Sequence, residues 1–298
     1  MDFMSQTLSE VSIILTETWV DDHFMLIAAV IFLIELIRYG FKKQLNWNLI
    51  GDSATNLVTL GFLLVTLFLV GLMYVGVFTY SYEHFSLTQL PITGWTVLGC
   101  LILADLAYYW EHRFLHSNGL AWGTHSVHHS SPYFNISVAY RFGPLDWFFP
   151  FFFHLPLVLM GFNPFVVLMC ETLVQLYQTL LHTEMVKKLP RPIEAIFNTP
   201  SHHRVHHATN KRYLDKNYAG ILIIWDRMFG TFVCEDEKVK YGVYPRINSV
   251  NPFKVYFDGY VKLGQQIWHA PNWAYRLQLL VKPPIWAWQQ KQKGNSNE

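Results

Sequence analysis

Long apolar runs separated by short polar stretches dominate the first 182 residues. The first three runs cover residues 23–40, 54–79 and 93–110. Each approaches the roughly 20 residues that a membrane-spanning helix needs. Two further runs, 145–162 and 164–182, meet at Asn163-Pro164, a pair typical of a tight turn. They predict a helical hairpin that spans the membrane or dips into it. The pattern therefore predicts an all-α integral membrane protein with four to five transmembrane or hairpin helices.

Composition agrees with this class. Hydrophobic residues make up 52% of the 298 and charged residues only 14%, whereas soluble domains carry about 25% charged residues. A net charge of +1 offers no basic surplus for nucleic acid, so no such partner is expected. The N-terminus has no basic region followed by a cleavage site, so no signal peptide is expected.

The basic residues orient the chain. None occurs in 1–37, whereas Arg38, Lys42 and Lys43 follow the first run, and none occurs in 142–186. Cytoplasmic loops collect Lys and Arg, so the 38–53 loop is expected in the cytoplasm. The protein then lies in a bacterial inner membrane or the endoplasmic reticulum.

This orientation divides the chain into four expected segments. They are a non-cytoplasmic N-terminus (1–22), three transmembrane helices (23–110), a histidine-rich catalytic region that includes the hairpin 145–182 (111–235), and a cytoplasmic or interfacial segment (236–298). The last segment mixes Trp with Lys and Arg, which favours the headgroup level of the membrane, or alternatively packing under a cap.

Three histidine-rich strings, "EHRFLH", "HSVHH" and "HHRVHH", follow the third run. Their histidines recur at i, i+3 and i+4, which places them on one face of a helix. Eight or more nitrogens are too many for one metal, which takes four ligands or three plus water, and suit two metals. Imidazole binds iron, zinc, copper and nickel. An all-histidine pair of metals at a membrane face most suggests iron and O₂ chemistry on a lipid.

Several other polar residues have open interpretations. Asp105 lies two helical turns before His112, and either makes an interhelical contact or orients a ligand histidine. Glu35 is expected to form an ion pair with Arg38. Glu171 is expected either to make a contact within the hairpin or to point at the metal site, and the sequence does not decide between the two. Isolated histidines are expected to be ordinary surface or core residues: His23, His84, His154 and His269.

The three strings, in this order and after membrane spans, resemble the fatty acid hydroxylase and sterol desaturase superfamily over about residues 95–235. Stretches such as "FNTPSHHRVHHATN" resemble the branch that contains alkylglycerol monooxygenase and its bacterial relatives. The resemblance implies a di-metal centre under a cytoplasmic helical cap. It implies nine metal ligands: His112, His116, His125, His128, His129, His182, His203, His206 and His207. It places His202 and Gln178 beside the ligands, Gln178 standing where some relatives have a tenth histidine.

The leading hypothesis is O₂-dependent hydroxylation of a lipid C–H bond by a histidine-ligated di-iron centre. Lipid or sterol desaturation on the same centre is the alternative. A metal transporter is less favoured because the ligands crowd at one face, and a zinc hydrolase because no HExxH string occurs. The expected cofactors are two iron ions, replaced by zinc in some preparations, and O₂. No GxGxxG motif occurs, so a separate electron donor is expected, either a tetrahydropterin or a cytochrome- or ferredoxin-type reductant.

Overall fold

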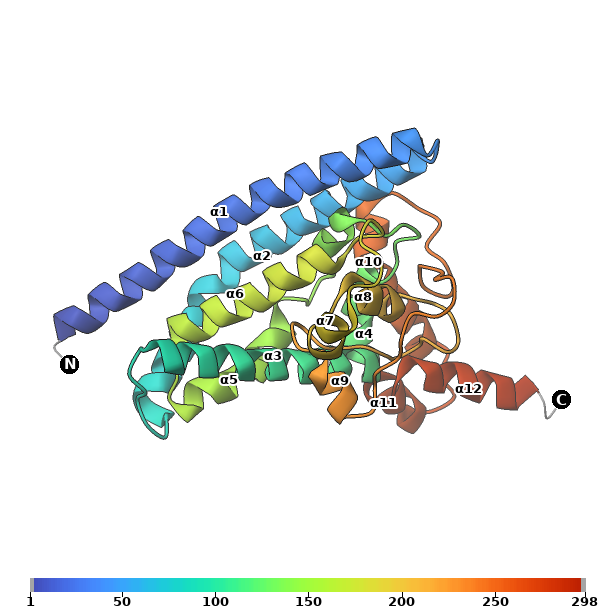
Figure 1. Cartoon of the computed structure of the whole chain (residues 1–298). Coiled ribbons are helices and arrows are strands. Elements are labelled where there is room, and N and C mark those ends of the chain that lie inside the picture. Colours follow the sequence, from blue (N-terminus) through green and yellow to red (C-terminus); the bar gives the residue numbers. More distant parts are fainter. Residues whose placement is uncertain (1–2, 296–298) are drawn as a thin grey trace.

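A computed structural model describes residues 3–295, and these residues form helices and loops with no β-strand. Five helices build the body of the molecule: α1 (Phe3–Phe41), α2 (Trp47–Phe85), α3 (Gly94–Ser117), α5 (Phe148–Met160) and α6 (Pro164–Leu181). In Figure 1, α1, α2 and α6 run roughly parallel, and α6 contacts α1, α2, α3 and α5. The predicted all-α class is confirmed.

Three of these helices are long and apolar enough to cross a membrane: Glu10–Phe41 of α1, α2 and α6. The third predicted run, 93–110, falls in α3, which does not reach that standard, because its last two turns carry the polar string "EHRFLHS". α5 rises only about 20 Å over its 13 residues, less than the roughly 30 Å hydrocarbon core. The hairpin of α5 and α6 therefore contains one helix of spanning length and one that is too short to cross alone.

The first helix begins much earlier than its apolar run suggests. It starts at Phe3, so most of the segment 1–22 belongs to the same helix as residues 23–40. Polar side chains in this part bond to other helices: Glu10 accepts from Asn163 (2.8 Å), and Glu17 from Thr172 (2.7 Å). The N-terminal half of α1 therefore packs along α6, which provides hydrogen-bond donors for the carboxylates of Glu10 and Glu17.

The turn between α5 and α6 follows ordinary capping rules. Gly161 ends α5 with φ +108°, a left-handed conformation that favours glycine. Asn163 then caps α6 through its side chain, which accepts from the backbone N–H of Phe165, and Pro164 occupies the first helical position. The turn that Asn163-Pro164 predicted is present.

The core of the helical body lies between α2, α3, α5 and α6. Its buried members include Phe78, Ala104, Leu157 and Val167, one from each of these helices. The outward faces of α1 and α2 are lined by exposed apolar side chains such as Leu26, Phe68 and Leu72. Apolar side chains on both the inside and the outside of a helical body are typical of helices surrounded by lipid.

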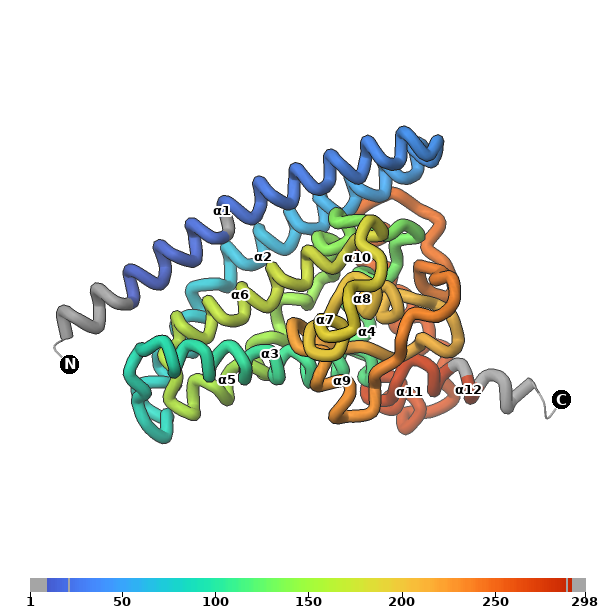
Figure 2. Tube along the Cα trace, in the orientation of Figure 1, coloured from blue at the N-terminus to red at the C-terminus, as the bar shows by residue number. Residues whose placement is uncertain are grey.

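The remaining helices lie at one end of the body and form a cap (Figures 1 and 2). They are α4 (Gly119–His128), the 3₁₀ helix η1 (Ile136–Tyr140), α7 (Arg191–Ile196), α8 (Pro200–His206), α9 (Ile224–Met228), α10 (Pro252–Trp268), α11 (Trp273–Val281) and α12 (Pro284–Asn295). The cap adjoins the end where α1 turns into α2, which is the end that carries Arg38 and Lys42.

Helices α4 and α10 cross closely at two glycines. A Cβ added to Gly259 would overlap the carbonyl oxygen of Gly123, and a Cβ added to Gly123 would overlap the Tyr260 ring. No side chain larger than hydrogen fits at this crossing. Since α4 carries the second histidine string, α10 fixes the position of that string.

Gly259→Ala is expected to destabilise the protein by about 1–3 kcal/mol through overpacking at this crossing. Gly264→Ala in the same helix is the matched control, because nothing lies within 4 Å of the added methyl group there. Alanine at that position is expected to be neutral or stabilising, since glycine is the weaker helix former. Chemical denaturation of the purified protein in detergent measures both. Equal effects of the two substitutions would contradict the packing account.

Candidate metal centre

Nine histidine side chains converge between the body and the cap, and they fall into two groups. In each group the ligand atoms all lie within 4.8 Å of one another. The first group is His112, His116, His125, His129 and His206. The second is His128, His182, His203 and His207. These are the nine residues that the resemblance implies, and the fold brings all of them together.

Each of the two HxxHH strings contributes two histidines to one group and one histidine to the other. At the end of α4, His125 and the following cap residue His129 are four residues apart and join the first group, whereas His128 joins the second. In α8 the outer pair, His203 and His207, joins the second group, and His206 turns to the first. Each string therefore serves both groups, which holds α4 and α8 in one register. α3 adds two residues to the first group, and the end of α6 adds His182 to the second.

Hydrogen bonds from outward-pointing Nδ1 atoms to backbone carbonyls fix the tautomers of three of these histidines. His112 Nδ1 lies 2.9 Å from the carbonyl of Tyr218, and His206 Nδ1 lies 3.0 Å from that of Lys216. His182 Nδ1 lies 2.9 Å from the carbonyl of Gln178. A carbonyl only accepts, so each Nδ1 donates its proton, and the Nε2 of the same neutral ring carries a free lone pair.

These lone pairs face one another. The Nε2–Nε2 distances are 3.1 Å for His112 and His125, 3.1 Å for His206 and His129, and 3.0 Å for His203 and His182. Where both nitrogens are acceptors, such a contact is repulsive unless a cation lies between them. Two nitrogens bound to one metal at about 2.1 Å and near-tetrahedral or right angles lie about 3.0–3.4 Å apart. The residues therefore fit a metal ion in each group.

Burial keeps the rings in the ligand form. The pKa values of His125, His129, His203, His206 and His207 lie well below the ordinary value, first because burial disfavours the charged form and second because other histidines are close. Burial also lowers the pKa of His182 to about 4. Neutral imidazoles bind metals without first releasing a proton. Two buried Nε2 atoms, of His116 and His207, have no hydrogen-bond partner among the described residues.

A loop after α8 supports the first group, and Asp105 holds that loop. The Asp105 carboxylate accepts from the backbone N–H of Leu222 (3.0 Å) and from the Trp225 indole (2.8 Å). Asp226 accepts from the N–H groups of Tyr218 and Ala219. Asp105 thus contacts no histidine directly, and its effect on His112 passes through the loop that carries the Tyr218 carbonyl.

The other two residues expected beside the ligands differ from each other. Gln178 supports the second group through its backbone carbonyl, while its amide donates to the carbonyl of Ala219 (2.9 Å). His202 turns away from both metal groups, and its Nε2 lies 3.1 Å from Glu194. His202 is the first residue of "HHRVHH", and its side chain lies about 100° around α8 from that of His203.

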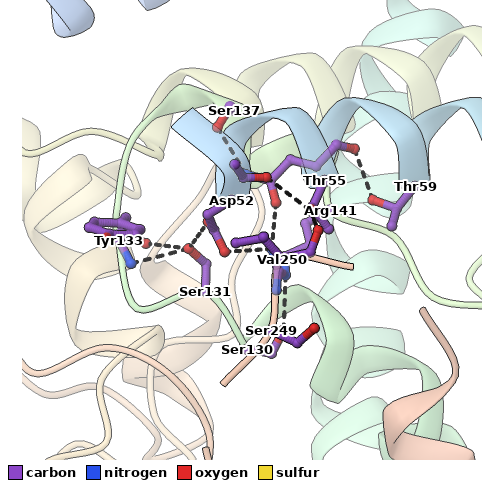
Figure 3. A network of polar contacts seen from close by, with 12 residues as sticks. Asp52, Thr55, Thr59, Ser130, Ser131, Tyr133, Ser137, Arg141, Ser249 and Val250 are labelled. Atoms are coloured by element: carbon purple, nitrogen blue, oxygen red, sulfur yellow. Dashed lines mark hydrogen bonds and ion pairs between the residues drawn. The ribbon is translucent and has the colours of Figure 1, made fainter. Parts of the chain in front are cut away.

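Arg141 and Asp52 are two buried charged residues that support the second group, and this role is not predicted from the sequence. Arg141 donates through Nε to the carbonyl of Val127 (3.0 Å) and to Ser130, and through Nη1 to Asp52 (3.0 Å) (Figure 3). The Arg141 carbonyl accepts from Nδ1 of His128 (3.3 Å). The side chain therefore fastens the end of α4 to α2, while the backbone orients a ligand candidate. The only signal in the sequence is an isolated Arg before an apolar run.

The expected pair of Glu35 with Arg38 is wrong. Glu35 is 1% exposed and accepts from the Ile136 N–H (2.8 Å) and from the Thr183 hydroxyl (2.6 Å). Its side chain lies on the inner face of α1, where it joins η1 to the segment after His182. Glu171 receives the Tyr74 hydroxyl (3.4 Å) and lies 3.9 Å from His154, so it makes contacts within the helical body. His23, His84 and His269 are exposed, as expected, and His154 is buried.

Comparison with known proteins agrees with this geometry. The profile of the family described as fatty acid hydroxylase matches residues 97–231, a range that includes all nine histidines. The chain carries a fatty acid hydroxylase domain. It is 43% identical to alkylglycerol monooxygenase of Danio rerio over 210 residues, which are 70% of this chain and 47% of that protein. It is 39% identical to alkylglycerol monooxygenase of Homo sapiens over 222 residues, 74% of this chain and 49% of that protein.

Two more distant relatives are named a hydroxylase and an oxidase. The chain is 33% identical to ornithine lipid hydroxylase of Rhizobium tropici over 152 residues, 51% of this chain and 45% of that protein. It is 24% identical to lathosterol oxidase of Homo sapiens over 173 residues, 56% of each chain. The chain spans about half the length of the alkylglycerol monooxygenases that it matches. No solved structure matches it significantly.

Removing one partner of the Arg141–Asp52 pair is expected to cost about 3–5 kcal/mol, because a buried charge is left uncompensated. Arg141→Met and Asp52→Leu together are expected to cost less than the sum of the two single changes. Arg212→Gln is the control, since its pair with Asp236 is exposed (63% and 38%) and is expected to be worth under about 1 kcal/mol. Denaturant titration gives the free energies. Additive effects of the two buried changes would contradict a coupled pair.

Proposed function

We propose that this protein hydroxylates a C–H bond of a lipid with O₂, using two irons held by the nine histidines. The observation that carries the proposal is the pair of buried histidine groups whose unprotonated nitrogens face one another at metal-binding distance. The names of the relatives, monooxygenase and hydroxylase, support the reaction class. The balanced reaction converts RH, O₂, two electrons and two protons to ROH and water.

The protein's own residues have three tasks in this reaction. The bound irons would supply the O₂-activating chemistry. The histidines hold them with lone pairs on Nε2, and backbone carbonyls fix the ring orientations. The metal groups are buried, so bulk water is excluded from them. The apolar body beside the cap suits a lipid chain better than a polar substrate.

Desaturation is the second candidate, because lathosterol oxidase is among the relatives. Both reactions remove a hydrogen atom from carbon, and they differ in whether oxygen is then added or a second hydrogen is lost. Both groups consist of histidines without a carboxylate. This argues against a hydrolase, which needs a general base at the metal. The product therefore distinguishes the two candidates.

Lipids from membranes that contain the protein are expected to gain one oxygen atom that derives from O₂. The measurement is mass spectrometry of total lipids after incubation with heavy-isotope O₂ and a reductant. Membranes that contain His125→Ala, His129→Ala, His203→Ala or His207→Ala are expected to form no product, because each change opens a metal position. His269→Ala is the exposed control and is expected to retain full product formation. A product with two fewer hydrogens and no heavy oxygen would favour desaturation instead, and active variants at matched protein level would contradict both.

We also propose that the metal centre lies on the cytoplasmic side, since the cap adjoins the end of α1 that carries Arg38, Lys42 and Lys43. Cys234 is exposed on the cap, so an impermeant maleimide is expected to label it only after cells are opened. Leu87→Cys, placed in a Cys234→Ser background, is expected to react in intact cells because Leu87 is 86% exposed in the α2–α3 loop. Labelling of Cys234 in intact cells would reverse the orientation.

A further inference from the structure

Two grooves open on the surface of the cap and share Asp236 and Glu237 in their walls. Their volumes are about 820 and 730 Å³. Together they are lined by eight basic and four acidic side chains. This local excess of four positive charges contrasts with the net charge of +1 for the whole chain. The grooves are therefore the place where a negatively charged partner is attracted.

Two of the four acids in these walls pair with arginines, whereas the lysines have no such partner among the described residues. Glu235 receives both Nε and Nη2 of Arg204 (2.8 and 2.7 Å), and Asp236 pairs with Arg212. The walls also carry five exposed lysines: Lys187, Lys188, Lys211, Lys238 and Lys240. None of these ammonium groups forms an ion pair within residues 3–295 as described. They are free to meet the charges of another molecule.

Aromatic rings connect this surface to the second histidine group. Tyr241 lines one groove, is half-buried, and stacks on Phe134 with ring centroids 4.9 Å apart and planes 7° from parallel. Phe134 is 1% exposed. Its ring centroid lies 5.2 Å from that of His207 and 5.6 Å from that of His182. Two stacked side chains therefore separate the open groove from the buried ligands.

We propose that the two grooves are the docking surface for an acidic one-electron donor protein, and that its electrons pass through Tyr241 and Phe134 to the second histidine group. This inference rests on the proposed hydroxylase function, which consumes two electrons and two protons for each O₂. The donor holds an iron–sulfur cluster or a haem and is oxidised by one electron at each encounter, so two encounters complete one turnover. The protons come from solvent.

A protein donor fits these grooves better than a small redox molecule. Small-molecule sites are enclosed and mostly apolar, whereas these grooves are open and lined by charged groups. Electron-transfer complexes are among the small, transient interfaces, and complementary charge raises the rate at which the partners meet. Tyr241 at the floor of the groove then provides the aromatic contact closest to the docked partner's centre.

The docking part is tested with purified full-length protein and a small acidic [2Fe–2S] ferredoxin as the probe. Binding is measured with and without iron at several salt concentrations, and needs no lipid turnover. The triple variant Lys187→Glu/Lys188→Glu/Lys238→Glu is expected to weaken binding by about tenfold or more. Lys254→Glu, an exposed lysine on α10 outside both grooves, is the matched control and is expected to bind like the parent. Binding that is insensitive to salt, or equal in the triple variant and the parent, would overturn the proposal.

The electron path is tested by anaerobic stopped-flow reduction of the iron-loaded protein. Tyr241→Leu removes the ring and is expected to slow reduction by the ferredoxin severalfold, while Tyr241→Phe keeps the ring and is expected to retain the parent rate. Reduction by dithionite and the iron content are expected to be the same in all three proteins, which excludes damage to the metal groups. Unchanged ferredoxin reduction in Tyr241→Leu would overturn the path. Because no lipid is present, these results stand or fall separately from the hydroxylase proposal.

Discussion

The mutual approach of unprotonated imidazole nitrogens in a buried space is the constraint on which the rest of the structure depends. Nine imidazole rings fall into two groups, and in each group the possible ligand atoms lie within 4.8 Å of one another. Where both facing nitrogens are acceptors, this arrangement is unfavourable without cations. The chain maintains it because the opposite nitrogen of several rings donates to a backbone carbonyl. Loops present those carbonyls to the histidines, and buried charged side chains hold the loops in place.

Each supporting device acts at one remove from the metal groups. Asp105 and Asp226 bind the backbone N–H groups of the loop that presents the Tyr218 carbonyl to His112. Arg141 fastens the end of α4 to α2, and Glu35 fastens η1 to the segment that follows His182. A charged side chain is costly to bury unless it is paired or fully hydrogen-bonded. These groups meet that condition, and so they fix the positions of the ligands.

The sequence predicts the long helices and the histidine-rich strings because both depend on spacing, whereas the inclusion of His182 comes from the family resemblance. The i, i+3, i+4 pattern places His125, His128 and His129 on one helical face, and the apolar runs locate the long helices. Spacing does not predict how each string is divided between two groups, since all three rings share that face and only the packing of α4 against α8 separates them. It also does not reveal the contact of Glu35 with Ile136 or that of Arg141 with Asp52, because these partners lie more than 80 positions apart in the chain. Contacts made by backbone carbonyls, such as that of Tyr218, cannot be predicted from the sequence because every residue has a carbonyl.

The proposed function requires two metal ions held by histidine nitrogens alone, five in one group and four in the other. X-ray absorption at the iron edge of the purified, iron-loaded protein tests it most directly, together with the metal content of the same sample. The account predicts two irons per chain, a nearest shell of nitrogen at about 2.0–2.2 Å, and the outer-shell scattering that imidazole rings produce. A single iron per chain, or a nearest shell that contains sulfur and lacks the imidazole pattern, would contradict it.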